Sequence, residues 1–228
     1  MAAERTAEEA KAHCISAMGQ DLGEVYAALW QETALLFRNW NEYVDLFGSK
    51  PSRVDLLNRA AGSFFRIVQD ALWEQTVLHV ARLTDPAASV GRSNLSIRRL
   101  LECIDDAEIK SLVAPTVDAA LEAARFCRDW RNRHIAHRDL DLALERAAEP
   151  LAAGTLEKVR QALDRLADVL NAVSRRYLDS ETHFDGHWYA GGQSLLHVLD
   201  RGVEAEEQRR QRIKAGQPLP DDFRRRDL

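Results

Sequence analysis

Apolar residues recur every three to four positions along most of the chain, which is the spacing of one face of an α-helix. The first such stretch covers about residues 7–47, where Gly19 and Gly23 predict a short helix that leads into a longer one. This stretch ends at Gly48 and Pro51, because glycine commonly follows the last helical residue and proline cannot continue a helix. A second long helix is predicted over about residues 53–83.

The second half of the chain has the same character. A Ser/Gly-rich loop begins at Pro86, and a short helix follows it near residues 97–104, with Asn94 or Ser96 as the candidate cap. A third long helix is predicted over about residues 107–136, in which Pro115 either starts a new helix or causes a kink. Further helices are predicted over about residues 155–177 and 192–214, followed by a loose tail from residue 216.

These elements predict an all-α fold, an up-and-down helical bundle with an extra C-terminal helix. No segment alternates with period two, and the 11 Gly and 6 Pro residues are few for a fold that needs many tight turns. The stretch HFDGHWYAGG at residues 183–192 differs in composition from its surroundings. We therefore expect a bundle over residues 1–180, and a connecting turn, C-terminal helix and loose tail over residues 181–228.

Charge and cysteine content limit the choice of partners and compartment. The formal net charge is −5, so the chain has no overall basic character of the kind that duplex-binding proteins show, although local basic clusters can still hold a few phosphates. The three cysteines form no CxxC motif, which is typical of reduced thiols. The N-terminus has no apolar signal region and no apolar run has transmembrane length, so we expect a soluble cytoplasmic protein with no membrane partner.

The densest group of chemically active side chains is the segment RFCRDWRNRHIAHRD at residues 125–139. Its basic residues are all Arg and His, whereas an ordinary solvated helix face usually mixes Lys with Glu. Arg presents a planar fork of donors suited to phosphate, and His exchanges protons near neutral pH. A site that moves protons and stabilises a charged phosphorus centre needs both residue types together.

The order of residues in this segment resembles a known signature. In Arg131-Asn132-Arg133-His134-Ile135-Ala136-His137, an Arg is followed by a polar residue and, after a short spacer, by His, as in the HEPN superfamily. The wider fragment DWRNRHIAHRD is similar to the abortive-infection U-type (AbiU-like) branch, and so are the preceding segments LWQETALLFRNWNEYVDLFG and FFRIVQDALWEQTVLHVARLTD. The resemblance extends from the first helix to Tyr177.

This resemblance implies a bundle that forms a homodimer and brings two copies of the motif into one cleft, which in active members is a metal-independent ribonuclease without a cofactor. His137 would transfer a proton during activation of the ribose 2′-hydroxyl, Arg131 would stabilise the pentacoordinate phosphorane, and Asn132 would orient the substrate. The implied partners are an RNA substrate, with transfer RNA as one candidate, and an antitoxin protein in a phage-defence or toxin–antitoxin system. The remaining basic residues of the segment are the predicted substrate contacts: Arg128, Arg133, His134 and Arg138.

The spacing of the motif leaves open which Arg–His pair acts. On an ideal helix Arg131 and His137 lie roughly 120° apart, so they converge only if the helix ends or distorts or if two subunits pair. Arg133 and His137 share a face, as do His134 and His137, and a second match runs from Arg128 to His134. We prefer Arg131 with His137 because Asn132 follows that Arg.

Other functions of the same residues are also open. The main alternative is a non-catalytic HEPN-like interaction and dimerisation module, in which the Arg/His cluster only builds an interface. His134 and His137 have the spacing of a metal pair, but further ligands at a recognisable spacing are missing, so no metal is expected. Phosphate-binding glycine loops and a GxSxG elbow are absent, which argues against nucleotide hydrolysis and serine-esterase chemistry.

Overall fold

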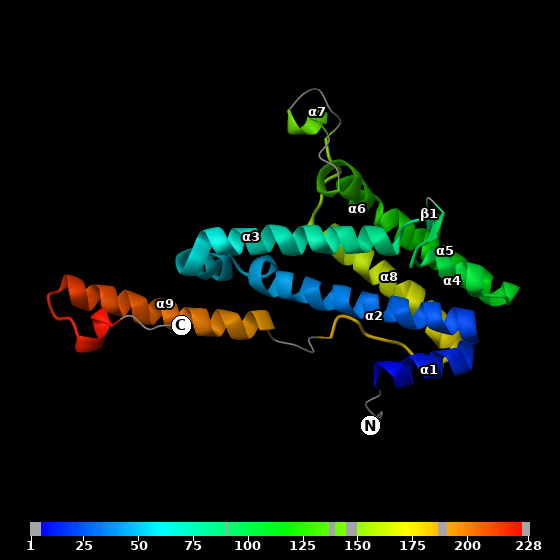
Figure 1. The fold of residues 1–228 in the computed structure, drawn as a ribbon, viewed down its shortest axis with the longest axis horizontal. Helices are drawn as coiled ribbons and strands as arrows, with labels where there is room; N and C mark the ends of the chain where they lie inside the picture. The colour runs from blue at the N-terminus through cyan, green and yellow to red at the C-terminus, as the bar shows by residue number, and fades with distance from the viewer. Residues whose placement is uncertain (1–5, 90, 137–139, 145–149, 187–190, 225–228) are drawn as a thin grey trace. The chain divides into compact units, whose positions relative to one another are not determined.

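The computed structural model describes residues 6–89, 91–136, 140–144, 150–186 and 191–224 (Figure 1). Within these residues the fold is all-α apart from one hairpin of two-residue strands, which confirms the predicted fold class. The helices are α1 (Ala7–Met18), α2 (Gln20–Tyr43), α3 (Pro51–Leu83), α4 (Arg98–Cys103), α5 (Ala107–Ala123), α6 (Arg125–Trp130), α7 (Leu140–Ala143), α8 (Leu156–Tyr177) and α9 (Gly191–Lys214). Shorter elements are the π-helices η1 (Val44–Gly48) and η2 (Arg131–Ile135), the 3-10 helix η3 (Pro220–Phe223), and the strands β1 (Ala88–Ser89) and β2 (Arg92–Ser93).

The two glycines of the first predicted stretch have different roles. Gly19 has a φ of +86° and separates α1 from α2, as the sequence predicts. Gly23 lies inside α2, where a Cβ atom would come within 2.5 Å of the Ile15 Cα atom. Gly23 therefore allows α1 and α2 to approach closely rather than breaking the helix.

Close contacts divide the described chain into two compact units. One unit contains residues 1–40 and 72–187, and the other contains residues 41–71 and 188–228. The expected division into a bundle over residues 1–180 and a C-terminal segment over residues 181–228 remains a prediction. Among the described residues, no helix combines the length and the apolar content needed to cross a membrane.

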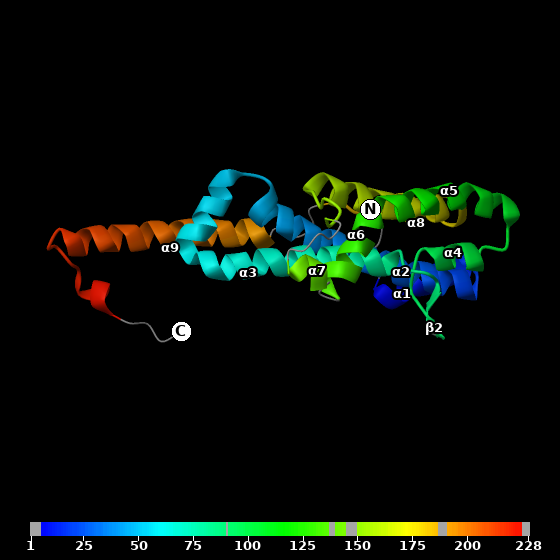
Figure 2. The same cartoon turned by 90° about the horizontal axis from the view of Figure 1, so that it is seen from above.

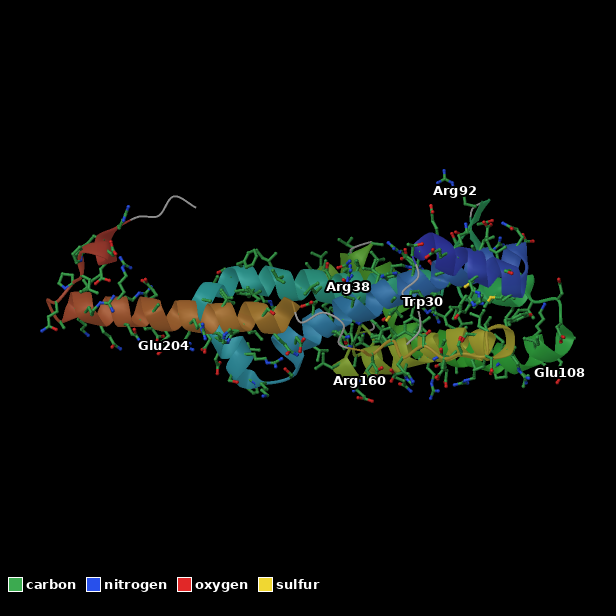
Figure 3. The ribbon with its side chains drawn as sticks, turned by 90° about the horizontal axis from the view of Figure 1, so that it is seen from below. Trp30, Arg38, Arg92, Glu108, Arg160 and Glu204 are labelled. Atoms are coloured by element: carbon green, nitrogen blue, oxygen red, sulfur yellow. The ribbon has the colours of Figure 1, made fainter. Side chains whose placement is uncertain are left out.

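The larger unit is built around the apolar face of α8, which packs along α5 (Figure 2). The residues of this face follow helical spacing and are fully buried, which explains why the sequence pattern located the helix well. After α8 the chain turns back onto α2: Asn171 holds Thr182 by two hydrogen bonds, and Trp30 donates from Nε1 to the Thr182 hydroxyl at 3.0 Å (Figure 3). Buried apolar residues of α8 are Val159, Ala162, Leu163, Leu166, Val169, Leu170 and Val173.

The segment predicted as one helix over residues 107–136 is divided into α5, α6 and η2. Helix α5 continues through Pro115, where Pro115 and Ser111 are both exposed, so water can satisfy the carbonyl that proline leaves without a donor. The break comes instead at Ala124, whose φ and ψ are −83° and 2°. This break redirects the chain just before the Arg-rich segment.

The smaller unit has its own apolar cluster, in which Leu196 of α9 packs with residues of η1 and α3. The start of α9 is fixed by polar contacts as well: the Gly192 N–H donates to Glu42 Oε2 at 2.5 Å, and the Gln193 amide donates to Asp45 Oδ1 at 3.1 Å. Near the C-terminus, η3 is joined to α9 because Arg212 donates to Asp222 Oδ1 at 2.6 Å. The buried members of the cluster are Leu46, Leu56, Leu57, Phe65 and Leu196.

Candidate functional site

The candidate site begins at a widened helical turn. Residues Arg131–Ile135 form a π-helix, in which the Ala136 N–H donates to the carbonyl oxygen of Arg131 at 2.8 Å. Such single π turns inside helices are rare and occur frequently at functional sites. This turn distorts the helix within the motif. Such a distortion is one of the conditions under which Arg131 and His137 could converge.

The Arg131 side chain is held by two oxygen acceptors from different parts of the chain. Its Nη1 group donates to Oδ1 of Asp85, and its Nε group donates to Oδ1 of Asn132 at 3.0 Å. The side chains of Arg131 and Asp85 are 23% and 19% exposed, so this ion pair lies at the edge of the protein interior. The guanidinium is therefore fixed in orientation while part of its surface still meets solvent.

Asp85 is itself held in place at the end of α3. Its carbonyl oxygen accepts from the Ser96 hydroxyl at 2.6 Å, and the same hydroxyl accepts from the Arg98 N–H at 3.3 Å. The N-cap of α4 is Ile97, so the prediction of Asn94 or Ser96 as the cap is wrong. The Ser96 hydroxyl still contacts the start of α4, whereas Asn94 bonds to the Pro86 carbonyl. The carboxylate that orients Arg131 consequently sits on a turn with little freedom.

Arg128 ties α6 to the same end of α3. Its guanidinium donates to the Thr84 hydroxyl at 3.2 Å and to the Leu121 carbonyl at 2.7 Å. Burial, together with the nearby charge of Arg98, lowers the pKa of the Arg128 guanidinium below its usual value. These contacts give Arg128 a role in positioning α6, and its predicted contact with substrate remains a prediction.

The loop at residues 150–154 is clamped onto α6. The Ala152 N–H donates to Asp129 Oδ2 at 2.9 Å, and Trp130 donates from Nε1 to the Ala152 carbonyl at 2.7 Å. At Gly154 an added Cβ atom would lie only 2.9 Å from Cζ2 of Trp73 and 3.2 Å from Cζ2 of Trp130. These two tryptophans therefore leave room for glycine alone. The loop is therefore a fixed wall beside the motif.

His134 lies against aromatic and acidic neighbours. Its ring meets Trp130 edge to face at a centroid distance of 5.5 Å, and its Nε2 atom is 4.0 Å from Glu74 Oε1. Trp130 in turn packs edge to face on Trp73 at 6.0 Å. Trp130 is therefore packed against other side chains of the protein, and the substrate role of His134 stays a prediction.

Arg133 belongs to different surroundings from Arg131. Its Nη1 atom is 3.4 Å from Asp129 Oδ1, and both residues line a cleft of about 960 Å³ that Arg131 does not line. The side chains of Arg131 and Asn132 are thus bonded to each other, whereas the Arg133 side chain lines the cleft. His137 and Arg138 lie outside the described residues, so the pairing of His137 with Arg131, Arg133 or His134 is still a prediction.

Asp85 is the functional candidate that sequence reasoning missed. It is 46 positions from Arg131, and no local spacing links the two residues. The available signal was weak: a carboxylate at the end of a long amphipathic helix, directly before Pro86, within the segment ending in HVARLTD that carries the family resemblance.

Metal binding and thiol chemistry can be examined only among the described residues, which do not include His137. No group of three or more His, Cys, Asp or Glu side chains there is arranged to hold a metal ion. Burial raises the pKa of the Cys127 thiol to about 12, so this cysteine is a poor nucleophile at neutral pH despite its position in the Arg-rich segment.

Comparison with known proteins agrees with the resemblance seen in the motif. The family model for AbiU2, a HEPN family, matches residues 19–190, about three quarters of the chain. No curated protein and no solved structure matches the chain. The matched region includes α2, α3 and α8 together with Asp85, Arg131 and Asn132. The chain therefore belongs to the AbiU2 family of HEPN proteins.

Proposed function

We propose that this AbiU2-family protein is a metal-independent endoribonuclease with a phage-defence or toxin-like role, and that its site is completed at a homodimer interface. The single observation that carries the proposal is the fixed, partly exposed guanidinium of Arg131 on the π turn of the HEPN motif. Membership of a HEPN family supports this choice of reaction. The local geometry supports Arg131 as a residue suited to it.

In the proposed reaction the ribose 2′-oxygen attacks the adjacent phosphorus and gives up its proton, with His137 as the proposed acceptor. The bond from phosphorus to the 5′-oxygen then breaks, and the leaving oxygen takes up a proton. The products are a 2′,3′-cyclic phosphate and a 5′-hydroxyl. Between these steps the phosphorane carries extra negative charge on its equatorial oxygens, and a cationic donor placed there lowers the barrier.

Arg131 is suited to that task because its donors are preorganised. Asp85 and Asn132 fix the plane of the guanidinium before substrate arrives, so little reorganisation is needed at the moment of reaction. Asn132 is exposed, and its Oδ1 atom accepts from Arg131, so the N–H groups of its amide are its means of donating to a ligand. This arrangement supports a role for Asn132 in holding a phosphate oxygen.

The alternative is a non-catalytic dimerisation module. The observation in its favour is that Asp85 already neutralises Arg131, as it would in a purely structural ion pair. The two functions differ in what happens to RNA in the absence of metal ions.

The test incubates the purified chain with transfer RNA and total RNA, both with and without EDTA, beside Arg131→Ala, His137→Ala and Arg160→Ala variants. Arg160 is an exposed arginine on α8 outside the motif, so its variant controls for loss of charge. The ribonuclease proposal predicts cleavage by the wild type and Arg160→Ala only. No cleavage by any form favours the module, and cleavage that EDTA abolishes contradicts both functions.

A further inference from the structure

A second surface beside the motif has the properties of a phosphate-binding cleft. It has a volume of about 960 Å³ and lies where α5, α6, η2 and the start of α8 meet the loop at residues 150–152. All of these elements belong to the larger compact unit. The lining residues that matter here are Arg125, Asp129, Arg133, Lys158, Gln161 and Arg165.

The cleft stays open because the residues at its walls are small. Helix α5 contributes Ala119 and Ala123, one turn apart, and the loop contributes Ala152. Along the facing edge of α8, Lys158, Gln161 and Arg165 follow each other at intervals of three and four, so their long side chains share one face. The result is a groove with short apolar walls and a polar, cationic edge.

The cleft is cationic although the chain as a whole is acidic. Four basic side chains line it, against the two carboxylates of Glu122 and Asp129, while the chain has a net charge of −5. Asp129 is already bonded to the Ala152 N–H and lies 3.4 Å from Arg133, and Glu122 lies 3.9 Å from Arg125.

Outside the lining, Asp168 accepts a hydrogen bond from Arg165 at 2.9 Å. The pairs made by Arg125 and Arg165 are solvent-exposed, and exposed pairs contribute little stability, so these arginines can exchange their partners for a ligand at small cost.

The cationic edge is held against a rigid wall. Lys158 donates from Nζ to the Ala153 carbonyl at 2.9 Å, and the neighbouring Ala152 is fixed to α6 by its bonds with Asp129 and Trp130. An anion entering the cleft therefore meets donors from α6, η2 and α8 beside a wall that is already fixed.

We propose that this cleft binds the phosphate backbone of the RNA strand. Arg forks, a Lys ammonium and the Gln161 amide suit phosphate oxygens. The aromatic residue of the cleft, Phe126, is only 6% exposed and offers little surface on which a base could stack. Recognition of the backbone alone predicts binding that is independent of sequence and similar for RNA and DNA, whereas cleavage requires the 2′-hydroxyl.

This inference rests on the proposed function, because it assigns the cleft to the same substrate. Asp129 and Arg133 of the cleft are carried by the α6–η2 segment that also carries Arg131, so a strand held here is anchored to the segment that presents the guanidinium. The cleft contributes affinity, and Arg131 contributes chemistry.

The test measures fluorescence anisotropy of a labelled single-stranded RNA with 2′-O-methyl groups, which the proposed reaction cannot cleave, and of a DNA strand of the same sequence. The full chain is compared with Lys158→Glu/Arg165→Glu and with the matched control Arg160→Glu/Arg176→Glu. The control changes the same charge on exposed positions of the same helix that do not line the cleft (Figure 3 labels Arg160). Circular dichroism melting checks that all forms fold.

We expect the cleft variant to lose about tenfold or more in affinity for both strands. The plot of its log K against log salt concentration should become less steep by about 1.4, because each of the two lost single-strand phosphate contacts contributes about 0.7. The control should lose far less. Equal losses in the two variants, or none in the cleft variant, would overturn the assignment. If RNA binding depends on the cleft but the wild type leaves natural RNA intact, the nuclease proposal alone is refuted. If the cleft variant cleaves natural RNA with the KM of the wild type, the cleft proposal alone is refuted.

Discussion

Replacing Asp85 by asparagine tests how Arg131 is held. The substitution keeps the shape of the side chain and removes its charge, so the charge-assisted bond to Arg131 Nη1 becomes an ordinary one or is lost. The two side chains are 23% and 19% exposed, which places the pair between a surface ion pair and a buried one. We therefore expect the free energy of unfolding to fall by about 1–2 kcal/mol, between the values typical of a surface ion pair and of a buried hydrogen bond to a charged group.

The substitution should also lower the rate of catalysis. A guanidinium that is free to tilt about the remaining Asn132 contact loses its alignment with the phosphorane, and loss of such a supporting residue typically costs about 10–100-fold in activity. Because Asp85 acts through Arg131 and not on the substrate in the proposed site, kcat should fall while KM changes little.

The assay combines urea unfolding with single-turnover RNA cleavage in EDTA for the wild type, Asp85→Asn and Asp70→Asn. Asp70 makes an exposed ion pair with Arg66 on α3, so its variant removes an equivalent charge without touching Arg131. A double-mutant cycle with Arg131→Ala should give a coupling of about 1–2 kcal/mol. Unchanged or faster cleavage by Asp85→Asn would refute the claim that Asp85 preorganises the arginine.

Three further predictions concern the surroundings of the site. Gly154→Ala places a methyl group 2.9 Å from Trp73 and 3.2 Å from Trp130, so we expect a loss of about 1–3 kcal/mol in urea unfolding, and an unchanged midpoint would show that the loop is not clamped. Cys127, with its buried thiol and a pKa of about 12, should resist a thiol reagent at pH 8 until the protein unfolds, whereas modification at the rate of an exposed thiol would contradict its burial. Burial lowers the pKa of His79 below 6.5, although the charge of Glu32 opposes the shift. As the pH drops, the unfolded chain therefore takes up the His79 proton before the folded chain does. The free energy of unfolding should consequently fall as the pH drops from 6.5 toward the folded-state pKa. A His79→Gln variant should lose this component of the pH dependence, and an identical pH profile for both proteins would exclude His79 as its source.

Local periodicity predicted the helices well because a helix that buries one face has apolar residues at every third or fourth position of the sequence. The helix expected over residues 155–177 is α8, Leu156–Tyr177, whose buried residues follow the helical repeat. The helix expected over residues 107–136 shows the limit of that signal. Its break occurs at Ala124. After it, Arg128 donates to the Thr84 hydroxyl and the Ala152 N–H donates to Asp129, and these long-range bonds fix a new direction for α6.

The candidate site could be predicted only where its residues are neighbours in the chain. Arg131 and Asn132 are adjacent, so their cooperation follows from the motif itself. Asp85 could not be found in this way, because its contact with Arg131 depends on how the end of α3 meets η2. The cleft around Lys158 and Arg165 was missed for the same reason: these residues look like an ordinary solvated helix face until α5 is packed beside them.

The most direct test of the account is analysis of the RNA ends formed by the wild type and by Arg131→Ala in EDTA. We predict that the wild type produces 2′,3′-cyclic phosphate and 5′-hydroxyl ends, and that Arg131→Ala, folded to the same extent by circular dichroism, produces none at a comparable rate. Equal cleavage by the two proteins, or intact RNA with the wild type, would contradict the assignment of Arg131 to phosphorane stabilisation.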